Sequence, residues 1–95
     1  MRIESRRITM EREVFTAEGE ESRRLLRELG SRIADLRELR NWSRFKLARR
    51  LGVPRGRVGR WERGECAPPI DSLVALSEVL DVSLDELVKG GRRAG

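Results

Sequence analysis

One stretch constrains the fold of this chain more than any other: Arg44 to Glu62, which reads RFKLARRLGVPRGRVGRWE. Ser43 stands at an N-cap position, and the apolar residues of the segment LARRL fall on one face of about two helical turns. Gly52 can adopt the positive φ that ends a helix and lets the chain turn sharply. Pro54 is well tolerated where a new helix begins. The stretch therefore predicts two short helices joined by a tight turn.

The second of these helices has two distinct faces. At 100° per residue, Val58 and Trp61 point to one side. Ala48 supplies a small residue where two steeply crossing helices would meet. A short helix whose outer face is basic and nearly free of side chains suits a close approach to a polyanion. We interpret the stretch as a helix-turn-helix; a generic basic helical hairpin is the alternative. The outer face comprises Arg55, Gly56, Gly59, Arg60 and Arg63.

Charge is segregated along the chain. The net charge is +5, yet residues 40–63 hold nine basic residues and one acid, Glu62, whereas residues 64–88 hold six acids and no base. A solvated charged surface usually mixes the two signs. This asymmetry therefore favours one directional face for nucleic acid.

Length and composition exclude several classes of protein. The 95 residues suit one domain, and their periodic aliphatic residues predict a folded core although 39% of the residues are charged. The single cysteine, Cys66, allows no internal disulfide, and without histidine the sequence offers no metal-ligand set. Without histidine or tyrosine no nucleophile–base arrangement can be assembled convincingly, so neither an enzyme nor a cofactor is predicted. No apolar run approaches the roughly 20 residues of a membrane span, and no signal-peptide core is visible, which predicts a cytoplasmic protein without a membrane partner.

The motifs LREL, LARRLGV, RWERG and VSLDELV, which lie between Gly30 and Val88, resemble the lambda-repressor-like (Cro, XRE-type) helix-turn-helix family. The placement of RWERG six residues after LGV is specific to that pattern. The resemblance implies an all-α fold of five helices, with the DNA-binding domain over residues 21–90 and a C-terminal tail over residues 91–95. Ser83 and Glu86 make an S-x-x-E capping box for the fifth helix.

The resemblance also implies which side chains meet DNA. Arg55 and Arg60 match the positions that the family points at base edges, where arginine pairs bidentately with the O6 and N7 of guanine. The glycines Gly56 and Gly59 beside them would allow a close approach. The predicted phosphate contacts are Arg44, Lys46, Arg57 and Arg63, of which Arg44 replaces the glutamine usual in the family.

A structural ion pair is implied as well. Arg37 and Glu62 match a family pair that joins the first helix to the recognition helix. Such a pair fixes the angle between helices more than it adds net stability. Trp42 falls where the family places an apolar core residue, whereas Phe45 stands at an exposed position that is usually polar.

Apolar residues recur at three- and four-residue spacing from Leu25 to Leu36, so residues 21–40 are predicted to be helical, with a kink at Gly30. Residues 1–20 lie outside the resemblance and are assigned to an N-terminal arm. Their apolar residues suit a short strand or an extended arm, and a mobile charged tail is the alternative. These residues are Ile8, Met10, Val14 and Phe15.

The predicted function is sequence-specific binding of double-stranded DNA by a transcriptional repressor. A homodimer would place two recognition helices in the major groove of a palindromic operator. Two surfaces could build that dimer: the arm, with Phe45 as a landing point, or the acidic C-terminal half around Leu84, Leu87 and Val88. The alternative function is the antitoxin of a toxin–antitoxin pair, whose residues 1–20 bind a toxin and whose domain binds its own promoter.

Overall fold

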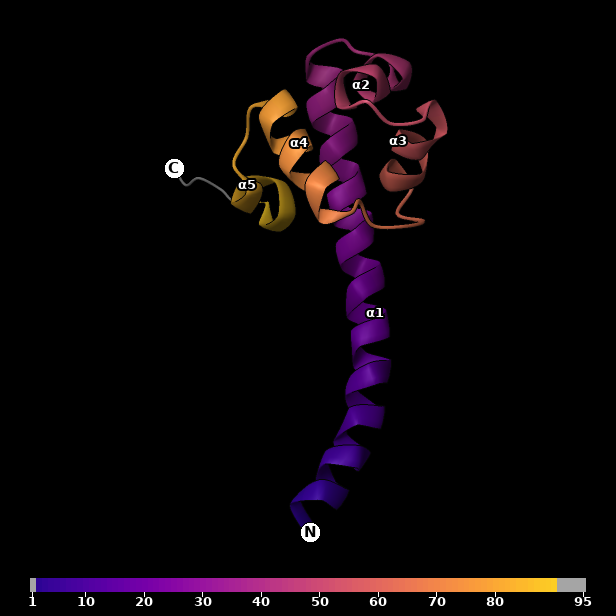
Figure 1. Ribbon diagram of the computed structural model, residues 1–95, viewed down its shortest axis with the longest axis vertical. Coiled ribbons are helices and arrows are strands. Elements are labelled where there is room, and N and C mark those ends of the chain that lie inside the picture. Colours follow the sequence, from indigo (N-terminus) through magenta and orange to yellow (C-terminus); the bar gives the residue numbers. More distant parts are fainter. Residues whose placement is uncertain (1, 91–95) are drawn as a thin grey trace.

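The computed structural model describes the backbone of residues 2–90 and the side chains of residues 19–90. Over residues 2–90 the secondary structure is entirely helical, which confirms the predicted all-α fold of five helices. Helices α2 to α5 surround the C-terminal half of α1, and the N-terminal half of α1 projects from the domain (Figure 1). The helices are α1 (Arg2–Leu39), α2 (Arg44–Leu51), α3 (Arg55–Glu62), α4 (Ile70–Leu80) and α5 (Leu84–Lys89).

The N-terminal extension is helical, which differs from the predicted strand or extended arm. Helix α1 begins at Arg2 and continues through residue 20 without interruption. Arginine and glutamate dominate this segment, and both are strong helix formers. A helix also satisfies its own backbone groups, whereas a lone strand would leave them without partners. The predicted contacts of Ile8, Met10, Val14 and Phe15, with a second copy or with a toxin, lie outside the described side chains.

Local capping explains where the short helices begin and end. The hydroxyl of Ser43 accepts a hydrogen bond from the backbone N–H of Lys46 at 3.0 Å, and Gly52 ends α2 with a φ of 73°. The predicted capping box of α5 is confirmed, because the N–H of Ser83 donates to Glu86 at 2.8 Å and the N–H of Glu86 donates to Ser83 at 2.9 Å. Each of these bonds satisfies a backbone donor that a helix start would otherwise leave free.

All five helices contribute to one core. Arg32 of α1 holds the last helix in place, since its Nη1 donates to the carbonyl oxygens of Leu87 at 3.0 Å and Val88 at 3.2 Å. Leu87 is fully buried in the core, so the prediction that it forms part of a dimer surface is wrong, whereas Leu84 and Val88 are exposed. The buried apolar side chains are Leu29, Ile33, Leu47, Ala48, Val58, Trp61, Leu76, Leu80 and Leu87.

Gly30 lies where α1 meets the end of α3. A Cβ atom at Gly30 would stand 2.3 Å from the carbonyl oxygen of Trp61 and 2.6 Å from that of Glu62. Helix α1 continues through Gly30 to Leu39 without a break, and the kink there stays a prediction. The glycine allows the backbones of α1 and α3 to approach each other more closely than any side chain would permit. Among the described residues, no helix is both long and apolar enough to cross a lipid bilayer.

We predict that Gly30→Ala destabilises the fold. Alanine gains about 1 kcal/mol of helix propensity over glycine, but its methyl group would overlap two backbone carbonyls that cannot rotate away. A net loss of about 2 kcal/mol in the free energy of unfolding is expected, which lowers the Tm by roughly 8–16 °C for a domain of this size. The matched control is Gly19→Ala on the same helix, where a Cβ would meet nothing within 4 Å. Thermal unfolding should show no loss for the control. A Gly30→Ala protein as stable as the parent would contradict the close approach.

Candidate nucleic-acid interface

Helices α2 and α3, together with the C-cap residue Arg63, carry eight exposed basic side chains. Sequence reasoning proposed six of them as DNA contacts and missed Arg49 and Arg50, which occupy the last turn of α2. Their spacing of four residues from Phe45 and Lys46 was a usable signal, because residues four apart lie on the same helical face. The eight exposed residues are Arg44, Lys46, Arg49, Arg50, Arg55, Arg57, Arg60 and Arg63.

The first turn of α3 is open at the molecular surface. Pro54 occupies the N-cap and provides no side-chain hydrogen bond to the first turn, and no acid lies in that turn. The free N–H groups and the helix dipole give such an end a partial positive charge that favours an anion. A Cβ at Gly56 would meet nothing within 4 Å, and a shallow depression of about 170 Å³ lies between Pro54, Gly56, Arg57 and Arg60. This end of α3 can therefore approach a large surface closely.

Gly59 departs from the expected open outer face. It is buried, and a Cβ there would lie 3.0 Å from Nη1 of Arg63 and 3.9 Å from Cδ of Arg44. Arg63 reaches back over the glycine one turn earlier and donates its Nε–H to Glu65 at 2.7 Å. That hydrogen bond lowers the pKa of the Glu65 carboxyl and raises the pKa of Arg63. Gly59 thus makes room for two arginine side chains, and the predicted phosphate contact of Arg63 would compete with Glu65.

The structure brings Arg37 and Glu62 together. Nε of Arg37 donates to Oε2 of Glu62 at 2.6 Å, and Nη2 donates to Oε1 at 3.2 Å. The third donor, Nη1, reaches the carbonyl oxygen of Trp42 at 2.8 Å. Both side chains are shielded, with exposed fractions of 10% for Arg37 and 2% for Glu62. The hydrogen bond to Glu62 raises the pKa of Arg37.

Glu62 has a second arginine partner that the sequence did not predict. Nε of Arg44 donates to Oε1 of Glu62 at 2.8 Å, although the Arg44 side chain is 53% exposed. One carboxylate therefore joins α1, α2 and α3. The predicted phosphate contact of Arg44 would come from a side chain whose Nε is already held in place.

Two aromatic rings near the start of α2 lie under basic groups. The guanidinium carbon of Arg50 is 4.7 Å from the centroid of the Trp42 ring, and that of Arg55 is 5.1 Å from the centroid of Phe45. Such separations are within the range of a cation–π interaction. Trp42 packs partly against the core, as the resemblance implies, whereas the Phe45 ring remains half exposed.

The fold and this surface define a class of protein: a five-helix domain that presents a helix-turn-helix on a basic face. The profile of the helix-turn-helix family matches residues 33–87. The chain belongs to the helix-turn-helix family, of the lambda-repressor-like (Cro/C1) type. Its relatives are transcription regulators rather than enzymes, as the sequence analysis predicts for this chain.

Several transcription regulators resemble parts of the chain. The HTH-type transcriptional activator BcrR of Enterococcus faecalis is 33% identical over 63 residues, which are 66% of this chain and 31% of that protein. An SPbeta prophage-derived HTH-type transcriptional regulator, YonR of Bacillus subtilis, is 36% identical over 61 residues, or 64% of this chain and 56% of that protein. The chain thus spans little more than half of these relatives at most. Among solved structures, the P22 c2 repressor in complex with a synthetic operator is 35% identical, with a TM-score of 0.64 over 66% of this chain and 96% of that one.

Proposed function

We propose that this protein binds specific sequences of double-stranded DNA and represses transcription by occupying an operator. The observation that supports this most directly is the exposed basic face of α2 and α3, at whose edge the first turn of α3 is open. A repressor needs only occupancy of the promoter, so no further chemistry is required of these residues. The similar proteins include both an activator and a repressor. That this chain represses rather than activates transcription is therefore part of the proposal.

Affinity would come from neutralised phosphates. Arg44, Lys46 and Arg57 lie on the exposed face together with the two arginines that end α2. Each cation that meets a phosphate releases condensed counterions, so binding should weaken steeply as salt increases. These contacts would set the register of the domain on the duplex without reading its sequence.

Specificity would come from the exposed side chains of α3. Arg55 and Arg60 carry guanidinium groups that can donate two parallel hydrogen bonds to guanine. Gly56 lies between them in sequence and adds no bulk, so α3 can enter a major groove closely. Gly59 would contribute indirectly, since its face is covered by Arg63.

We predict separate effects for the two groups of basic residues. After selection of a preferred site from random duplex DNA, Arg55→Ala or Arg60→Ala should cost about 1–3 kcal/mol at one base position and relax the preference there. Arg44→Ala or Lys46→Ala should weaken binding to every duplex and reduce the slope of log K against log salt by about 1. Titration against the selected site and a scrambled site at several salt concentrations measures both. Equal losses on both duplexes for Arg55→Ala and Arg60→Ala would show that these side chains do not read bases.

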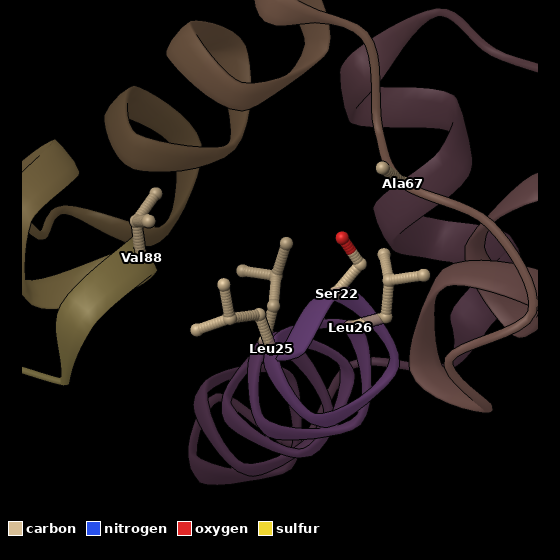
Figure 2. A pocket seen from close by; sticks show the side chains of 6 residues that line it. Ser22, Leu25, Leu26, Ala67 and Val88 are labelled. Atoms are coloured by element: carbon tan, nitrogen blue, oxygen red, sulfur yellow. The ribbon is translucent and has the colours of Figure 1, made fainter. Parts of the chain in front are cut away.

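The proposed dimer rests on an apolar pocket beside the projecting part of α1. Figure 2 shows Leu25 and Leu26 of α1 facing the same pocket as Val88 of α5 and Ala67 of the loop between α3 and α4. The pocket holds about 420 Å³, and its walls are almost wholly apolar. On α1 the pocket is lined by residues 22–29, which directly follow the N-terminal arm of residues 1–20, and on α5 it is lined by Val88, one of the residues that the sequence offered for a dimer surface.

We assign a second copy of this chain to that pocket. The part of α1 that projects from the domain precedes the pocket residues, of which Ser22 is the first (Figure 1). A single helix of about 20 residues, which spans about 30 Å, is marginal in water without tertiary contacts. A two-fold pairing would give each projecting helix a partner and cover the apolar pocket at its base. It would also place two α3 helices on one duplex, about 34 Å apart for a palindromic site.

We predict that Leu25→Glu dissociates this dimer, because a carboxylate would be buried in an apolar contact. Sedimentation equilibrium at tens of micromolar should give a dimer for the full chain and a monomer for Leu25→Glu. Leu39→Glu is the matched control, since Leu39 is an exposed leucine at the other end of α1. A chain lacking residues 1–16 should also dissociate if the projecting helix contributes. A monomeric full chain, both free and on operator DNA, would refute the dimer.

A further inference from the structure

Phe45 is an apolar ring on an otherwise basic face. It is the second residue of α2, and 49% of its surface is exposed. An exposed phenylalanine gains little free energy from burial in the core. Its contacts with neighbouring side chains on the basic face therefore indicate its role. The guanidinium carbon of Arg55, the first residue of α3, lies 5.1 Å from the ring centroid, and that of Arg49 lies 5.8 Å from it. The ring therefore connects the start of α2 with the start of α3.

The contact that fixes an arginine side chain determines which of its N–H groups remain free to donate hydrogen bonds to a ligand. Arg44 and Arg63 are held by carboxylates, and each has its Nε–H engaged in a hydrogen bond. A guanidinium that lies against an aromatic ring uses its π face instead. Its N–H groups point outward in the guanidinium plane and remain available for the O6 and N7 of guanine. Arg55 is held in this second way.

We propose that Phe45 is a positioning residue that orients Arg55 for base reading, an inference that rests on the proposed function. The ring restricts the rotamers of a long side chain before DNA is present and leaves its donors free. Less conformational freedom is then lost when Arg55 meets a base. Phe45 thereby raises the preference for the base that Arg55 reads, without contacting that base itself.

The test compares three side chains at position 45. Phe45→Leu keeps an apolar residue but removes the ring, whereas Phe45→Tyr keeps the ring. Two duplexes are needed: the selected site, and the same site with the guanine whose contribution is lost in Arg55→Ala replaced by adenine. Phe45→Leu should weaken binding to the selected site by about 2- to 5-fold, the worth of an exposed cation–π contact, and should leave the adenine duplex unchanged. Phe45→Tyr should bind like the parent.

The coupling to Arg55 is tested in the Arg55→Ala background, where Phe45→Leu should have no further effect. A loss of the same size on both duplexes, or in the Arg55→Ala background, would overturn the proposal, because Phe45 would then act on DNA or on the fold by itself.

A measurement on the protein alone separates this inference from the proposed function. The Cδ protons of Arg55 should show an upfield ring-current shift in NMR spectra, which Phe45→Leu removes and Phe45→Tyr retains. A parent protein that shows this shift but binds no duplex DNA would refute the proposed function, and base reading with it. Binding to DNA without the shift, and without coupling between the two residues, would refute only the role of Phe45.

Discussion

The carboxylate of Glu62 receives hydrogen bonds from Arg37 of α1 and Arg44 of α2, and the arrangement of the three helices depends on it. An acid at the last residue of a helix is unfavourable for the helix dipole, and a buried one is costly to desolvate. Two guanidinium partners offset both costs. The backbone of Gly30 completes the contact, since it admits the carbonyl oxygens of Trp61 and Glu62 against α1. Helix α3 is thus held firmly at its C-terminal end, while its N-terminal end faces outward.

The basic residues differ in the contacts that fix their side chains. Arg37 is shielded and serves the fold, whereas Arg44 and Arg63 are half exposed and bound to Glu62 and Glu65. Arg55 is held by an aromatic ring, which leaves its N–H donors in place for a ligand. The sequence alone suggests a uniformly basic surface, but its arginine side chains differ in which N–H groups remain available for hydrogen bonds. For Arg44 and Arg55 this difference accords with the proposed division between phosphate contacts and base contacts.

The sequence predicts well the features that arise from local chemistry. The cap at Ser43, the left-handed Gly52, the capping box of α5 and the inward faces of α2 to α4 all follow from residue type and spacing. The sequence predicts poorly the features that depend on contacts with another helix. The role of Gly30 can be predicted only when the positions of the α3 carbonyl oxygens are known. The burial of Gly59 likewise depends on the path of the Arg63 side chain. The second partner of Glu62 and the burial of Leu87 have the same origin in tertiary packing. The length of α1 does not follow from apolar periodicity, because the few apolar residues of the first 20 positions are scattered, and the helix there consists largely of arginine and glutamate, which are strong helix formers.

Denaturant unfolding of the parent, Arg37→Met, Glu62→Leu and the double variant tests most directly whether this shared carboxylate fixes the helices. Arg37→Met alone should lower the free energy of unfolding by about 3 kcal/mol, at the low end of the range for a broken buried pair because Arg44 still donates to Glu62. The double variant leaves neither charge buried without its partner, so much of that loss should be recovered, with a coupling energy of about 2 kcal/mol. Losses in the two single variants that simply add in the double variant would contradict a shared network at Glu62.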